Sequence, residues 1–113
     1  MAVDVWSIAA ATAVVGYDLA KDQDVASQGY DRALTGLGLT GSAAAGDTIV
    51  DVFIDDVKIA TVTNTATGVA APGDHIQPIE PRAIPANSKF KMRVVDAPAT
   101  NPIWAYVETE RLE

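Results

Sequence analysis

The chain has 113 residues, of which 49% are hydrophobic and 20% charged, and this predicts one folded domain over residues 1–113. Fifteen acidic residues against eight basic ones give a net charge of −7, which argues against nucleic-acid binding through a basic face. The chain has no cysteine and one histidine, which excludes disulfides, thiolate metal sites, His-rich metal sites and a cysteine nucleophile.

Residues 3–15 combine β-branched side chains with the alanine-rich run 9–13. The segment is compatible with a strand or a helix, and its valines favour the strand. Its apolar run is shorter than the about 20 residues that cross a bilayer, so no membrane span is expected. No signal peptide is recognised, because the first positive charge is Lys21. The final Leu112-Glu113 is typical of an expression-vector junction.

Residues 32–40 predict a strand that is weakened by glycines, and a flexible loop is expected over residues 41–46. Strict alternation along this strand would put Leu34 on one face of a sheet. It would put Leu37 and Leu39 on the opposite face.

Residues 48–63 contain two β-rich runs around Asp55-Asp56, which predicts a hairpin with a two-residue turn. In that register the facing pairs are Ile54 with Val57, Val52 with Ile59, and Val50 with Thr61. The predicted core face carries Val50, Val52, Ile54, Val57 and Ile59. The opposite face carries Asp51, Phe53, Lys58, Ala60 and Val62.

All six prolines lie between Pro72 and Pro102. Residues 72–85 hold four of them, so this segment is expected to be an ordered crossover or an edge segment, because proline cannot donate to a β-ladder. Alternating patterns predict further strands over 88–96 and 103–110, with a loop over 97–102 between them. Together these segments predict an all-β, antiparallel, jelly-roll-like sandwich of about six to eight strands.

Trp104 and Tyr106 share one side of the last predicted strand, whose other side carries Ile103, Ala105 and Val107. Three interpretations follow: the aromatic side faces the core, contacts another subunit, or forms a ligand platform. The candidate interface residues are Trp6, Phe53, Trp104 and Tyr106.

Catalytic and metal-binding patterns are weak. Asp74 precedes His75, and Ser88 is a candidate nucleophile, but no catalytic signature surrounds them. Two acidic groups could offer oxygen ligands to calcium. These are Asp51, Asp55 and Asp56, and Asp18, Asp22 and Asp24. Acidic turns serve solubility equally well, so we expect no catalytic residue, no metal and no cofactor, and the protein is not expected to be an enzyme.

Three segments carry a family resemblance: residues 46–55, residues 84–88 and residues 96–102. In these strand-and-turn features the chain resembles small β-sandwich or single jelly-roll proteins of virus and phage particles, either capsid or capsid-decorating subunits. The resemblance implies a structural role in a virion, a symmetric homo-oligomer of three or more copies and a major capsid protein as partner. It transfers no catalytic residue.

The leading hypothesis is therefore a non-enzymatic assembly subunit that self-associates through apolar and edge-strand surface. The alternative is a small ligand-binding or carbohydrate-binding sandwich module, with or without calcium. That module would need an exposed aromatic platform with polar neighbours.

Overall fold

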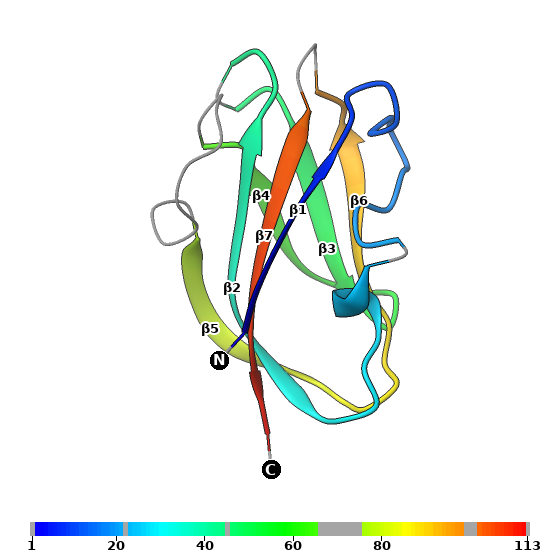
Figure 1. Cartoon of the computed structure of the whole chain (residues 1–113), viewed down its shortest axis with the longest axis vertical. Coiled ribbons are helices and arrows are strands. Elements are labelled where there is room, and N and C mark those ends of the chain that lie inside the picture. Colours follow the sequence, from blue (N-terminus) through cyan, green and yellow to red (C-terminus); the bar gives the residue numbers. More distant parts are fainter. Residues whose placement is uncertain (1, 22, 45, 66–75, 99–101, 113) are drawn as a thin grey trace.

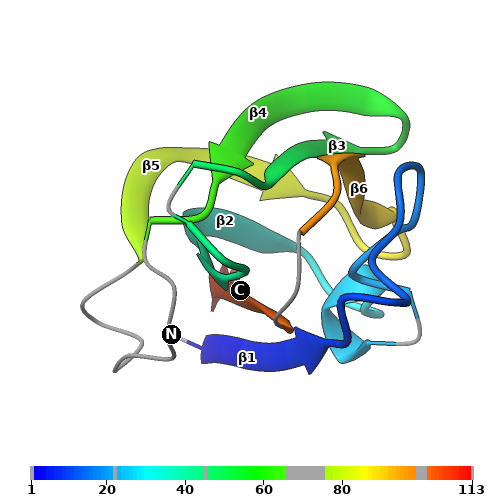
Figure 2. The same ribbon diagram turned by 90° about the horizontal axis from the view of Figure 1, so that it is seen from above.

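The computed structural model describes residues 2–21, 23–44, 46–65, 76–98 and 102–112. They form two antiparallel sheets that pack face to face, as Figures 1 and 2 show, and this confirms the predicted all-β sandwich. The described part contains no α-helix and one turn of 3-10 helix, η1 (Asp24–Ala26). Its principal extents are 41 × 27 × 20 Å.

The four-stranded sheet has the order β1-β7-β2-β5 and the three-stranded sheet has the order β4-β3-β6. The strands of the first are β1 (Ala2–Ile8), β7 (Ile103–Arg111), β2 (Arg32–Gly41) and β5 (Gln77–Ile84). The strands of the second are β4 (Val57–Thr63), β3 (Ile49–Ile54) and β6 (Phe90–Asp96). The proline-containing β5 is an edge strand, as expected. Residues 72–75 and residues 99–101 of the predicted 97–102 loop lie outside the described residues.

The N-terminal strand is shorter than predicted, because β1 ends at Ile8. The alanine-rich stretch that follows forms turns, in which the amides of Thr12 and Ala13 donate to the carbonyl of Ala9 at 2.9 and 3.0 Å. It is therefore neither a continuation of the strand nor a helix. Without β-branched residues at 9–11, nothing extends the ladder with β7.

The central hairpin is confirmed, but its predicted register is wrong beyond the turn. Asp55 and Asp56 form the turn with φ of 51° and 68°, the left-handed values that a two-residue hairpin loop requires. A β-bulge then makes Ile59 the extra residue, so that Val52 faces Ala60 and not Ile59. Val50 likewise faces Val62 instead of Thr61. The bulge turns Ala60 and Val62 toward the core, whereas Val57, predicted as core, is 64% exposed.

The prediction that the leucines of β2 lie on opposite faces is wrong, because β2 contains a second bulge. The register of β2 shifts between Leu34 and Gly36 against both neighbouring strands. Leu34, Leu37 and Leu39 therefore all enter the core. The extra residue, Thr35, is held by hydrogen bonds from its hydroxyl to the carbonyl oxygen (3.2 Å) and carboxylate (2.9 Å) of Glu108.

The predicted 41–46 loop is tied down by a buried amide. Asn64 Oδ1 accepts hydrogen bonds from the backbone amides of Gly46 and Thr48, both at 3.0 Å. Its Nδ2 donates to the carbonyls of Gly41 (2.9 Å) and Ala44 (2.8 Å). Gly41 has φ of +111°, and a Cβ there would come within 2.1 Å of a neighbouring carbonyl oxygen, so only glycine fits.

Candidate functional site on the outer faces of the sheets

The core side of β7 is the small-residue side. Ile103, Ala105 and Val107 are each at most 1% exposed and belong to the hydrophobic core. Trp104 and Tyr106 therefore project from the outer face of the four-stranded sheet. This overturns the interpretation in which the two aromatic side chains face the core, and leaves the subunit-interface and ligand-platform interpretations.

Tyr106 lies on this outer face but has no exposed surface. Its cross-strand neighbours are Val5 on β1 and Gly38 on β2, and Gly38 has no side chain to compete for the space above the sheet. The phenol oxygen lies 3.0 Å from the hydroxyl of Thr40. Because Tyr106 is covered within its own chain, it offers no surface to a partner, and the expectation that it is an interface residue is corrected.

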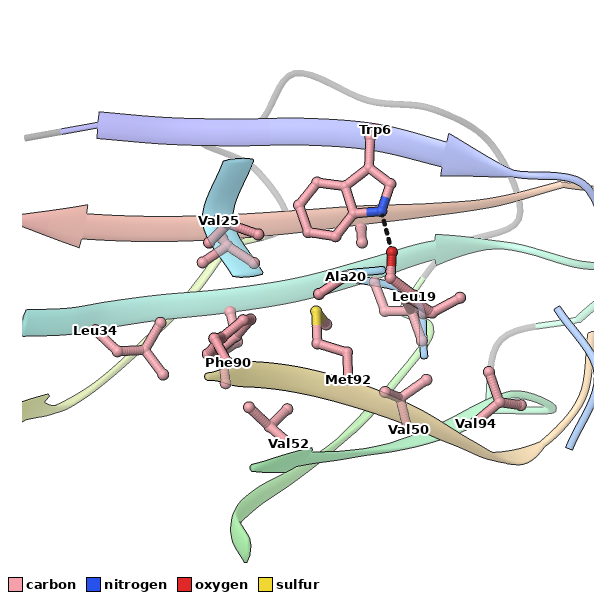
Figure 3. Packing of buried hydrophobic residues seen from close by; sticks show 14 of the residues in the cluster. Trp6, Leu19, Ala20, Val25, Leu34, Val50, Val52, Phe90, Met92 and Val94 are labelled. Atoms are coloured by element: carbon pink, nitrogen blue, oxygen red, sulfur yellow. Dashed lines mark hydrogen bonds between the residues drawn. The ribbon is translucent and has the colours of Figure 1, made fainter. Parts of the chain in front are cut away.

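Trp6 is likewise part of the interior. Its indole points from β1 into the core beside Val25, Leu19 and Met92, as Figure 3 shows. The indole N–H donates to the carbonyl of Leu19 at 2.7 Å. With 9% of its surface exposed, Trp6 stabilises the sandwich from within and is not an interface residue.

The remaining aromatic residue of this face, Trp104, is only partly buried. Its cross-strand partners are Ser7 on β1 and Thr40 on β2. Val3 and Val5 lie on the same face of β1 and are 45% and 37% exposed. We call Val3, Val5 and Trp104 the outer apolar patch. The sequence analysis identified Trp104 as a candidate but not the two valines. The alternation of Val3 and Val5 with Asp4 and Trp6 indicates that the valines lie on the opposite face of the strand from Trp6.

Phe53 lies on the opposite outer face, at the centre of the three-stranded sheet. It lines a groove of about 460 Å³ together with Gly16, Asp18, Asp56, Lys91 and Arg93. Lys91 Nζ lies 2.8 Å from Asp56 Oδ1, and this contact lowers the pKa of Asp56 and raises the pKa of Lys91. Arg93 makes no ion pair in the part of the chain that the structure describes. The groove therefore combines an aromatic side chain with an unpaired cation.

Phe53 and Trp104 thus lie on different sheets, and the structure does not bring the four predicted interface residues together. The alternating cations of β6 were visible in the sequence. Their position beside Phe53 follows only from the pairing of β3 with β6, in which Phe53 faces Lys91.

Of the acidic residues considered as calcium ligands, Asp18, Asp51 and Asp55 accept hydrogen bonds within the fold, and Asp56 pairs with Lys91. Asp51 Oδ1 lies 3.3 Å from Lys58 Nζ and accepts from the Thr61 hydroxyl at 2.8 Å. Asp55 accepts from the backbone amide of Lys89 at 2.9 Å, and this bond lowers its pKa. Asp18 accepts two further backbone amides. Asp22, like Asp74 and His75, lies outside the described residues.

Over the described ranges, no three His, Cys, Asp or Glu side chains are grouped so that they could hold a metal ion. Every buried side-chain nitrogen or oxygen of that same part has a hydrogen-bond partner. None of its helices is long and apolar enough to span a membrane. Comparison of the chain with protein-family models, with curated proteins and with solved structures finds no match.

Proposed function

We propose that the protein is a non-enzymatic structural assembly subunit, of the capsid or capsid-decorating kind found in virus and phage particles. The observation that carries the proposal is the outer apolar patch, in which Val3 and Val5 are 45% and 37% exposed on the same sheet face as Trp104, with Val5 diagonally next to Trp104 and Val3 one step further along β1. Exposed apolar groups that adjoin one another on a sheet gain free energy when a partner covers them.

Each contact contributes a modest free energy, so association depends on several copies contributing. Burying a methylene-sized group is worth about 0.8 kcal/mol, so covering two valines and part of an indole supplies a few kcal/mol per contact. The net charge of −7 keeps dissociated subunits soluble. A closed symmetric assembly repeats the contact and so multiplies its contribution.

Light scattering coupled to size-exclusion chromatography tests this proposal over a range of protein concentrations. We expect a discrete oligomer of three or more copies that dissociates on dilution. The variant Val5→Lys should shift the population toward monomer, because it places a charge in the patch. Val95→Lys is the matched control: Val95 is 41% exposed but lies on β6, in the other sheet, so it should leave the mass unchanged.

The two tryptophans allow a second readout. In the variant Trp6→Phe, Trp104 is the sole indole, since the chain has two tryptophans. We expect its emission to shift to longer wavelength as the oligomer dissociates. A monomeric mass at every concentration, with constant emission, would overturn the proposed function.

The groove at Phe53 supports a second candidate, a small ligand-binding module. An aromatic ring beside an unpaired guanidinium suits a ligand with an apolar face and a carboxylate, such as an acidic sugar. Thermal melting with uronic-acid oligosaccharides should then raise Tm, and neutral oligosaccharides of equal length should not. The variant Arg93→Ala should abolish the shift.

A further inference from the structure

Three of the four sheet edges carry features that block the addition of another strand. β5 contains Pro78 and Pro81, which cannot donate a ladder hydrogen bond. β6 is covered by residues 16–19, which make three backbone hydrogen bonds to it at 2.7–2.9 Å. β1 carries Asp4 on its core side, opposite the buried Val107, and an inward charge of this kind opposes edge pairing.

The fourth edge, β4, is different. It pairs with β3 alone, and no described strand lies along its other side; Figure 2 shows it at the rim of the sandwich. Its protective features, Lys58 and the bulge at Ile59, belong to its first half. The second half, Ala60–Thr63, is uncharged and mostly β-branched, and Thr61 and Thr63 are exposed.

A groove of about 250 Å³ lies beside this open half, between β4 and β5. Its lining residues are all uncharged and include Leu37, Val62 and Ile79. An occupant must therefore supply a strand edge together with uncharged side chains. In a chain with 15 acidic residues, the open half of β4 itself meets both requirements.

We propose that a second copy of this chain adds its own β4 at this edge, antiparallel and about a two-fold axis through Thr61. The inference rests on the assembly role proposed above and names the strand that carries one of its contacts. The two three-stranded sheets then form one continuous sheet, and each copy covers the groove of the other.

Two features of β4 determine this register: the alternation of its side chains between the two faces and the position of Lys58. A core-facing residue must lie opposite another core-facing residue, so the axis passes through a residue and not between two. An axis at Thr61 places Ala60 opposite Val62 on the core side and the two threonines opposite each other outside. It also keeps the two Lys58 side chains at opposite ends of the paired stretch, whereas parallel pairing would bring them together.

Neighbouring registers are less favourable. An axis at Ala60 would place the bulged Ile59 next to the centre of the ladder, opposite Thr61, whereas an axis at Thr61 leaves it at the end of the paired stretch, opposite Thr63. An axis at Val62 would pair Ala60 with Asn64, whose side chain and backbone amide are already committed to residues 41–48. Because the contact is two-fold, a larger oligomer needs a second contact, which the outer apolar patch supplies.

Single cysteines test the register, since the chain has none of its own and any disulfide must join two copies. Facing residues of an antiparallel pair have Cα atoms about 4.5–5.5 Å apart, within disulfide range. Thr61→Cys should therefore give a disulfide-linked dimer as the main product of mild oxidation on a non-reducing gel. Thr63→Cys is the matched control on the same face, because its two copies would lie roughly 13 Å apart and should not link.

A charge variant and the unmodified protein complete the test. Thr61→Lys places two ammonium groups opposite each other and should weaken the β4 contact about fivefold. In the unmodified chain, amide hydrogen exchange of residues 60–63 should slow as the concentration rises. If the protein forms oligomers but shows neither cross-linking through Thr61→Cys nor concentration-dependent exchange, the β4 contact is wrong and the assembly role still stands. If the protein is a monomer at every concentration, the assembly role itself is wrong.

Discussion

The two long sides of the sandwich are closed by different means. Between β1 and β6 the chain fills the gap itself: residues 13–25 supply the buried Ala13, Leu19, Ala20 and Val25 and bond to the backbone of β6. Between β4 and β5, the described residues that pack against the core include partly buried side chains such as Ala60, Val62 and Ile79, and a groove remains. One side is complete within a single copy, whereas the other presents a strand edge and uncharged surface.

The largest effect is expected on the self-filled side, at Trp6. Replacing it with alanine removes a buried indole and its hydrogen bond, and should lower the free energy of unfolding by about 3–5 kcal/mol. Trp6→Phe should cost about 1–2 kcal/mol, because the Leu19 carbonyl then loses its partner. Denaturant unfolding followed by circular dichroism measures both values; a loss below about 1 kcal/mol for Trp6→Ala would contradict the closed-side packing.

A smaller effect is expected at Asp18, which fastens the same segment to β6. Its Oδ1 accepts from the amides of Ala20 (3.0 Å) and Met92 (2.9 Å). Asp18→Ala should lower the free energy of unfolding by about 1–3 kcal/mol and speed exchange of both amides. Asp18→Asn keeps an acceptor oxygen and should lose less, and equal losses for the two variants would count against this role.

The open side should be more tolerant, which a matched pair of valines in the same sheet can show. Val94→Ala, at 1% exposure on β6, should cost about 2–3 kcal/mol. Val62→Ala, partly exposed on β4 beside the groove, should cost about 1 kcal/mol in the monomer. Unfolding is measured at concentrations low enough to keep the protein monomeric. Equal losses of unfolding free energy for Val94→Ala and Val62→Ala would contradict the proposed difference between the two sides of the sandwich.

The smallest effect is expected at the hairpin turn, as a function of pH. Hydrogen bonds from the Lys89 amide and Ser88 lower the pKa of Asp55 below its ordinary 3.8. A carboxyl whose pKa is lower in the folded state stabilises the fold above its unfolded pKa, and this contribution is lost as the pH falls through the folded pKa. Thermal melting below pH 4 should therefore show a shallower fall in Tm for Asp55→Asn than for the unmodified chain.

Local patterns in the sequence predict much of the fold, because strand alternation and turn residues act over short distances. The Asp55-Asp56 turn and the proline-bearing edge both follow from such patterns. These local patterns do not predict the two bulges, because a bulge depends on which strand pairs with the bulged one. The closed side escapes them as well, because Leu19 and Val25 belong to an irregular segment without periodicity.

The candidate surfaces were predictable only in part, for a related reason. An aromatic residue such as Trp104 can be identified in the sequence as a candidate contact residue, but the exposure of its side chain depends on its neighbours across the sheet. Tyr106, two residues along the same face, has no exposed surface, and its hydroxyl lies within hydrogen-bond distance of the Thr40 hydroxyl on the neighbouring strand. Arg93 becomes a candidate ligand-binding residue only because β6 pairs with β3. The sequences of the two strands do not reveal this pairing.

The position of β7 has a consequence for how the chain acquires its structure. β7 lies between β1 and β2, and among the described strands it alone pairs with β1. During synthesis β1 therefore stays unpaired with β7 until residues 103–111 have emerged from the ribosome. Contacts of such long sequence separation slow folding, and a nascent chain stalled before residue 103 would keep the central hairpin but not half of the larger sheet.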